Sequence, residues 1–156
     1  MLTPFRRVVF QAFIVILGIW TGAGIHDTLM NHFAWWADPL AYVRERVLVP
    51  GIVNPWPFTT GIFSILTLTA LASFARYRGE AKRAVMAVLV SAVMVLAVTG
   101  VYFVPQLGRM ADPALPDADL LRYSKDWIRF NAARIVFLIG LFYFAVSTLA
   151  RMSKAA

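Results

Sequence analysis

Trp127, Asn131 and Arg134 are the residues whose types and spacing most suggest chemistry in this chain. Their spacing of i, i+4 and i+7 places them on one face of a helix. They precede an apolar run, residues 135–150, which contains no charged residue. These 16 residues reach only ~24 Å, less than the ~30 Å hydrocarbon core, so a membrane-crossing helix must include the polar stripe. Charged groups at such depth usually face the interior of a bundle or a wet cavity.

The position of Arg134 also fits an anchoring role. Arg134 lies 17 residues before Arg151. That separation is ~25 Å along an ideal helix, only a few ångströms inside the far edge of the bilayer. An arginine at that depth can extend its guanidinium to the headgroups. Position alone therefore leaves a membrane anchor and a functional residue as equal alternatives.

His26 is the best candidate for a general base, because neutral imidazole accepts protons near physiological pH. A histidine that caps the helix end or faces water is an equal alternative for His26. His26 lies 19 residues from Arg7, or ~28 Å along a helix, close to the depth of Arg134. The only other histidine, His32, falls near the aromatic pair at 35–36, where water is accessible. We therefore expect His32 to cap a helix or to be solvated.

A metal centre is a minority alternative. His26 and His32 are six residues apart, which is poor spacing for two ligands on one helix. The chain contains no cysteine, so disulfides, thiolate metal sites and cysteine nucleophiles are excluded. We expect no metal and no other cofactor, with a metal bound by the two histidines as the alternative.

Four apolar segments must position these side chains. Hydrophobic residues make up 60% of the 156-residue chain, well above the ~45–50% of soluble domains. The predicted fold is all-α: one integral membrane four-helix transmembrane bundle over residues 1–156. Its predicted spans are about 8–28, 57–75, 84–105 and 127–150.

The net charge of +7 follows the membrane topology. Eight of the fifteen basic residues lie at the two termini or in the connection at 76–83, whereas the other connections are near neutral. This positive-inside pattern places both termini in the cytoplasm, and we expect a bacterial cytoplasmic membrane. The basic residues form no face with groove-reading or stacking geometry, so we expect contact with membrane lipids and not with nucleic acid.

Local signals refine the four-span pattern. Asp38-Pro39 predicts a helix start, followed by a short interfacial helix at 40–49 between spans one and two. Pro105 is expected to close the third helix, and Asp117 to cap the fourth. Three glycines in the first span are expected to allow close helix contact: Gly18, Gly22 and Gly24.

Polar and aromatic residues from all four spans reach one depth. Counted from the basic residue at the cytoplasmic end of each span, they lie ~25–30 Å along ideal helices: His26, Trp56, Thr59, Tyr102, Asn131 and Arg134. The rest of each span is almost wholly apolar. An apolar pocket with a few convergent polar groups is the usual form of a small-molecule site. The sequence therefore predicts an outward-facing cavity.

The chain resembles the anthrone oxygenase-like proteins, a family of small four-helix membrane proteins formerly described as a domain of unknown function. The resemblance rests on the first-span glycines, on Pro105-Gln106 after span three and on Trp127-x-x-Phe130-Asn131-x-x-Arg134. The family commonly has asparagine where this chain has Gln106, which keeps an amide and changes its reach.

The resemblance implies oxygenation of a lipophilic polycyclic phenol without a conventional redox cofactor. It implies that His26 is the base and that Asn131 and Arg134 hold the oxyanion. It also implies ligand-binding roles for five further residues: Trp56, Tyr102, Gln106, Trp127 and Phe130.

Two other functions compete with an oxygenase. One is a non-catalytic membrane subunit of a larger complex, in which the polar stripe locks helices together; this function predicts a filled interior. The other is a transporter, but transporters tend to place polar groups at the bilayer midplane, which is apolar here. An oxygenase predicts a cavity that reaches Arg134.

Overall fold

The computed structural model describes residues 3–44, 56–78 and 81–154, without the side chains of residues 31–32, 56–57 and 153–154. The predicted all-α four-helix bundle is confirmed, and no strand occurs in the described part of the chain. The helices are α1 (Pro4–Ala37), α2 (Pro39–Tyr42), α3 (Trp56–Ala75), α4 (Lys82–Val98), the π-helix η2 (Thr99–Phe103), α5 (Val104–Met110) and α6 (Asp117–Lys154).

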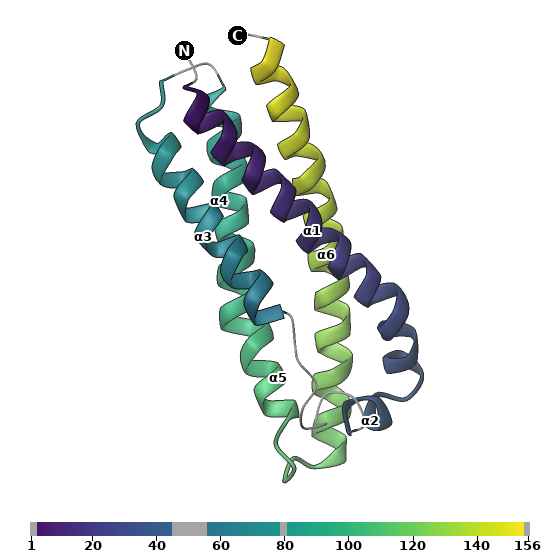
Figure 1. The fold of residues 1–156 in the computed structure, drawn as a ribbon. Helices are drawn as coiled ribbons and strands as arrows, with labels where there is room; N and C mark the ends of the chain where they lie inside the picture. Colours follow the sequence, from purple (N-terminus) through teal and green to yellow (C-terminus); the bar gives the residue numbers. More distant parts are fainter. Residues whose placement is uncertain (1–2, 45–55, 79–80, 155–156) are drawn as a thin grey trace.

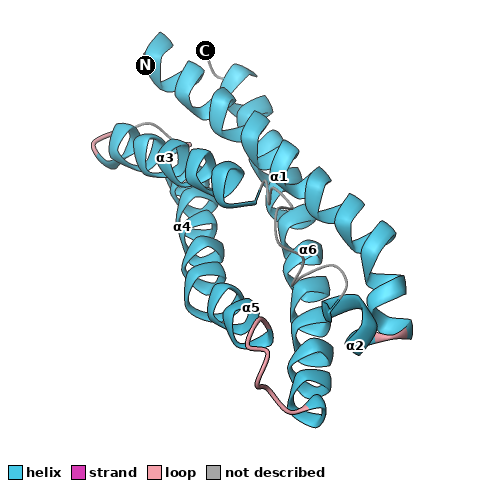
Figure 2. Ribbon diagram, turned by 60° about the horizontal axis from the view of Figure 1, so that its bottom comes forward, coloured by secondary structure: helices cyan, strands magenta, loops and turns pink. Residues whose placement is uncertain are grey.

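Four helical segments are long and apolar enough to cross a membrane: Pro4–Met30, Phe58–Ala75, Lys82–Met110 and Asp117–Met152. This architecture is that of an integral membrane protein. Both termini lie at one end of the bundle (Figure 1), which we name the terminal end; the opposite end is the α2 end. Helix α1 packs against α3 and α6, and α4 also packs against both, so the four long helices form a closed ring of neighbours (Figure 2).

Polar side chains begin the helices at positions that the sequence indicates. The Thr3 hydroxyl accepts a hydrogen bond from the Arg6 backbone N–H at 3.4 Å, one residue before Pro4 opens α1. The Asp38 carboxylate likewise accepts from the Ala41 N–H at 3.0 Å, so the expected cap of α2 is confirmed.

The expected interfacial helix at 40–49 is described only to residue 44. Its described part, α2, packs against α6, and Val43 is fully buried. Arg44 forms an ion pair with Asp117 at the start of α6. Asp117 is therefore the first residue of α6 and a partner of Arg44, not the residue before the helix that we expected. These contacts fasten the described part of the interfacial helix to the α2 end of the bundle.

Pro105 does not close the third helix, and in this respect the sequence-based expectation is wrong. The helix continues through η2 into α5 and ends at Met110. In η2 the Val104 N–H donates to the Thr99 carbonyl, five residues earlier. This wider turn precedes Pro105, which has no N–H and would crowd the carbonyl of the preceding turn in a regular α-helix. The π-helix thus allows the span to continue through Pro105.

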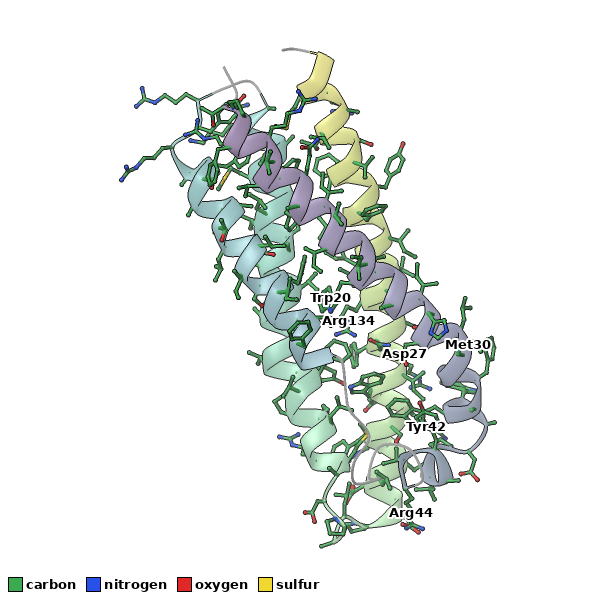
Figure 3. All side chains as sticks on the ribbon, viewed as in Figure 1. Trp20, Asp27, Met30, Tyr42, Arg44 and Arg134 are labelled. Atoms are coloured by element: carbon green, nitrogen blue, oxygen red, sulfur yellow. The ribbon has the colours of Figure 1, made fainter. Side chains whose placement is uncertain are left out.

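The flanks of the bundle are apolar, as lipid contact requires. Nitrogen and oxygen atoms gather toward the two ends, and carbon dominates the flanks between them (Figure 3). Large apolar side chains with more than half of their surface exposed include Val15, Ile19, Ile65, Leu68, Met94, Val136 and Tyr143. Seven Ser and Thr hydroxyls within the spans bond the preceding turn of their own helix; Thr67, for example, donates to the Phe63 carbonyl at 2.7 Å.

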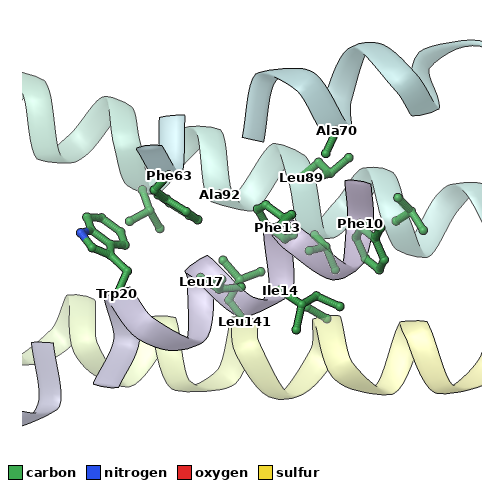
Figure 4. Close-up of a cluster of buried hydrophobic side chains, with 14 of the residues drawn as sticks. Phe10, Phe13, Ile14, Leu17, Trp20, Phe63, Ala70, Leu89, Ala92 and Leu141 are labelled. Carbon is green, nitrogen blue, oxygen red and sulfur yellow. The ribbon is translucent and has the colours of Figure 1, made fainter. Parts of the chain in front are cut away.

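Two clusters of buried side chains fill the bundle. The larger one, the main core, joins α1, α3, α4 and α6 and is rich in stacked aromatic rings (Figure 4). Within it, Phe13 lies 5.9 Å from Phe63, and Phe63 lies 4.7 Å from Trp20, measured between ring centroids. The smaller one, the α2-end core, consists of Trp35, Val43, Phe103, Met110, Leu120, Trp127 and Ile128.

Two of the three expected contact glycines of α1 face α6. A Cβ atom on Gly18 would lie 2.9 Å from Phe142 Cε2, and one on Gly24 would overlap the Ile135 side chain. A Cβ atom on Gly22 would meet nothing within 4 Å, so Gly22 is not part of this contact. The close approach of α1 and α6 therefore depends on Gly18 and Gly24.

We expect Gly24→Val to destabilise the bundle by ~1–3 kcal/mol, because the branched side chain must displace Ile135. Gly22→Val is the matched control, since it adds the same side chain to the same helix in open space. The midpoint of thermal unfolding in detergent should fall for Gly24→Val only. Equal midpoints for the two variants would show that α1 and α6 do not depend on this contact.

Candidate functional site

Arg134 lies inside the bundle, half-buried, and is held by two hydrogen bonds. Its Nη2 donates to the Asn131 side-chain oxygen at 2.5 Å, and its Nη1 donates to the Thr99 hydroxyl at 3.3 Å. Thr99 in turn donates to the Val95 carbonyl at 2.8 Å, so its hydroxyl is used in both directions. The alternative in which Arg134 points into the bundle and pairs with another helix is confirmed, and the anchoring role is not.

Aromatic faces from two helices flank the guanidinium. The Arg134 Cζ atom lies 4.2 Å from the ring centroid of Phe103 and 5.7 Å from that of Trp20. Both distances allow a cation–π attraction, which gains strength away from water. The carboxylate of Asp27 also interacts electrostatically with Arg134. Trp20, Asp27 and Arg134 meet where α1 passes α6 (Figure 3).

One hydrogen-bond donor of Arg134 remains unused. Its Nε is buried and has no hydrogen-bond partner among the described residues. An unsatisfied buried donor costs ~1–3 kcal/mol, more if it is charged, and a ligand oxygen would reach this one only if a neighbouring side chain moved. The position of Arg134 between the main core and the α2-end core leaves this donor far from the polar ends of the bundle.

A cavity of about 510 Å³ opens between α4–η2 and α6, beside Arg134. This volume falls within the ~300–1,000 Å³ range of small-molecule sites. Arg134 is the one charged residue of the nine that line it, and almost all of the lining surface is apolar. The lining comprises Met94, Val95, Val98, Tyr102, Phe103, Phe130, Ala133, Arg134 and Phe137.

Four of the predicted site residues gather at this cavity. Arg134, Tyr102 and Phe130 line it, and Asn131, fully buried, orients the guanidinium from behind. The rings of Tyr102 and Phe130 meet edge to face with centroids 5.1 Å apart, which joins the two walls. The side chain of Gln106, one turn beyond Tyr102, forms a hydrogen bond with the side chain of Tyr102. Gln106 does not line the cavity.

Trp127 has a packing role in the structure. Its ring stacks on Trp35 at 4.7 Å and meets the edge of Phe103 at 5.7 Å. These contacts make Trp127 part of the α2-end core and leave it out of the cavity lining. The ligand contact implied for Trp127 therefore does not match its position.

His26 is exposed on α1 and does not line the cavity. The side chains of His32 and Trp56 lie outside the described residues, so the two-histidine metal site and the ring contact of Trp56 cannot be placed. Among the described residues, no group of three histidine, aspartate or glutamate side chains is positioned to hold a metal ion. The structure thus brings Asp27, and not His26, toward Arg134.

Sequence reasoning missed four partners of Arg134: Trp20, Asp27, Thr99 and Phe103. Thr99 carried a usable signal, because it lies 16 residues from Arg83, or ~24 Å along a helix, at the depth of Arg134. Phe103 was missed because a helix that closes at Pro105 was expected, and not the π-helix that contains Phe103.

No protein-family model, no curated protein and no solved structure matches this chain.

Proposed function

We propose that the protein is a membrane-embedded oxygenase-like enzyme that binds a lipophilic phenolic molecule in the cavity beside Arg134. The observation that carries this proposal is the combination of an apolar cavity and a single cationic group in its wall. The family resemblance of the Trp127–Arg134 motif supplies the reaction class. The cavity and Arg134 support the substrate class.

The residues of the site suit stabilisation of an oxyanion. When a polycyclic phenol of the anthrone type loses a carbon-bound proton to a base from the solvent, the negative charge moves onto its oxygen. The guanidinium of Arg134, a lining residue, would attract that oxygen, and the low dielectric of the apolar wall would strengthen the interaction. In the overall reaction a methylene group and O₂ give a carbonyl group and water, so the substrate supplies all the electrons.

The exposed position of His26 argues against direct contact with a molecule in the cavity. The proposal therefore gives anion stabilisation to Arg134 and orientation of Arg134 to Asn131 and Thr99. Tyr102 and Phe130 would contact the rings of the substrate from the two sides.

Oxygen uptake by the purified protein in lipid nanodiscs, with anthrone as substrate, tests the proposed function. Uptake of one O₂ per anthrone consumed, above the rate in empty nanodiscs, is the expected result. Uptake no faster than in empty nanodiscs would refute the oxygenase. It would favour the non-catalytic membrane subunit, whose apolar flank would then face partner helices as well as lipid.

We also propose that the terminal end faces the cytoplasm, in a bacterial cytoplasmic membrane. Seven exposed or half-exposed basic side chains support this orientation: Arg6, Arg7, Arg76, Arg78, Lys82, Arg83 and Arg151. Since the chain has no native cysteine, the labelling of single introduced cysteines can report the orientation of the protein in the membrane. An impermeant maleimide added to intact cells should label Ala114→Cys, near the α2 end, and spare Arg78→Cys. The opposite labelling pattern would invert the topology.

A further inference from the structure

The cavity opens on the flank of the bundle. Large side chains of its lining are strongly exposed on both walls: 63% for Met94 and 51% for Val98 on α4, and 55% for Phe130 and 50% for Phe137 on α6. A cavity enclosed by the bundle would bury these side chains. Their exposure places its mouth between α4 and α6, on the surface that is apolar along its length.

The depth of the mouth places it within the hydrocarbon layer. Met94 lies 11 residues from Arg83, or ~17 Å along the helix, and Tyr102 lies 19 residues from it, or ~28 Å. The hydrocarbon core is ~30 Å thick. The mouth therefore extends from about the middle of the bilayer toward the α2 end.

The α2-end core closes the other route to Arg134. Trp35 and Trp127 stack at 4.7 Å, and both are buried. Val43 and Met110, also part of this cluster, are fully buried at the same end. These side chains fill the interior between Arg134 and the water-facing surface at this end, where we had expected an outward-facing cavity.

We propose that the ligand enters the cavity sideways from the bilayer, between α4 and α6, and binds with an acceptor oxygen toward the Arg134 guanidinium. This inference rests on the cavity of the proposed function and specifies its ligand: a molecule dissolved in the membrane, with an apolar body and an oxygen that accepts hydrogen bonds. Charge complementarity selects this occupant, because a phospholipid acyl chain offers no acceptor to the guanidinium.

A spin label at Phe137→Cys tests the direction of access, because Phe137 lines the cavity and the label replaces a large side chain there. The chain has no other cysteine. The labelled protein is studied in nanodiscs by electron paramagnetic resonance. Collision rates are measured with O₂, which concentrates in hydrocarbon, and with a water-soluble nickel chelate. A label at Ala114→Cys, in the exposed connection after α5, is the water-accessible control. Met94→Cys is a second cavity position if Phe137→Cys does not fold.

We expect the cavity label to collide often with O₂ and rarely with the nickel chelate. Anthracene-9-carboxylate should then immobilise the label and lower its O₂ collision rate. Anthracene, which has the same rings and no oxygen, should need a mole fraction at least ~10-fold higher, because it lacks the charge-assisted hydrogen bond.

Three results would overturn the inference. Frequent collisions with the nickel chelate would show that the cavity opens to water. A label shielded from both reagents would show that a second copy of the chain covers the mouth. A lipid-accessible label that anthracene-9-carboxylate does not shield would show that acyl chains occupy the cavity.

The two proposals can fail separately. If the label behaves as expected and anthrone is not oxidised, the sideways access stands and the oxygenase is wrong. If anthrone is oxidised and the label collides with the nickel chelate, the oxygenase stands and the sideways access is wrong.

Discussion

Arg134→Met should lower the rate of oxygen uptake with anthrone by ~100-fold or more, because the cavity loses its one cationic donor. Removal of a single oxyanion donor costs ~10²–10³ in rate in enzymes that stabilise a developing oxyanion. Arg134→Lys should also lose most of the rate. A lysine ammonium keeps the charge but cannot donate to Asn131, to Thr99 and to a ligand from one planar group. The measurement is oxygen consumption in nanodiscs at saturating anthrone.

The matched control is Arg129→Met, since Arg129 is exposed on the same helix and does not line the cavity. It should keep the wild-type rate. Thermal unfolding of Arg134→Met must be followed in parallel, because the buried side-chain oxygen of Asn131 loses the hydrogen bond from Arg134 in that variant. A folded Arg134→Met or Arg134→Lys protein with undiminished oxygen uptake would remove Arg134 from the site.

Ala133→Phe should prevent ligand binding, and Ala132→Phe should not. Both alanines are exposed neighbours on α6, so the two variants add the same side chain to the same stretch of helix. Only Ala133 lines the cavity, and a phenyl ring there fills the space next to Arg134 without removing a hydrogen bond. We expect the apparent Kd for anthracene-9-carboxylate to rise by ~30-fold or more in Ala133→Phe, equivalent to ~2 kcal/mol.

Energy transfer from tryptophan to the bound anthracene ring can measure this affinity in nanodiscs, with the partitioned background taken from protein-free discs. Equal affinities of the Ala133→Phe and Ala132→Phe variants would show that the cavity between α4 and α6 is not where the ligand binds.

The four spans could be predicted, and an inward direction was one of the two alternatives for Arg134, because each rests on a large free energy. Apolar runs such as 135–150 must be buried in lipid or protein, and a guanidinium at the depth of Arg134 favours polar partners. The cap of α2 at Asp38 could be predicted for a similar reason, since an aspartate before proline satisfies a free backbone N–H.

The rotation of α1 about its axis could not be predicted. This rotation determines that His26 is exposed and does not face the cavity. His26 and Asp27 project ~100° apart on a helix, so a modest rotation exchanges the residue that faces the bundle. The contact of Gly24 with Ile135 fixes the rotation. His26 lies two residues later, ~200° around the helix, and so points away, whereas Asp27 lies ~60° from the contact face. If the contact of Gly18 and Gly24 with α6 had been known, it would have been sufficient to place His26 and Asp27.

The direction of the cavity could not be predicted either, because it depends on side chains that are distant in sequence. Trp35 and Trp127 are 92 residues apart in the chain, and their stacking closes the α2 end. The π-helix that carries Thr99 and Phe103 to Arg134 shifts the register of the third span relative to a regular helix. Counting residues at a uniform rise of ~1.5 Å gives the depth of these residues in the membrane. It does not show on which side of the bundle the cavity opens.

The most direct test of the central claim is the NMR signal of the Arg134 Nε–H group in arginine-labelled protein, assigned with Arg134→Lys. This donor has no hydrogen-bond partner among the described residues. We predict that saturation with anthracene-9-carboxylate moves its proton resonance downfield, whereas anthracene leaves it in place. An Arg134 Nε–H resonance that does not move when anthracene-9-carboxylate is bound would contradict the claim that Arg134 recognises the oxygen of a ligand in this cavity.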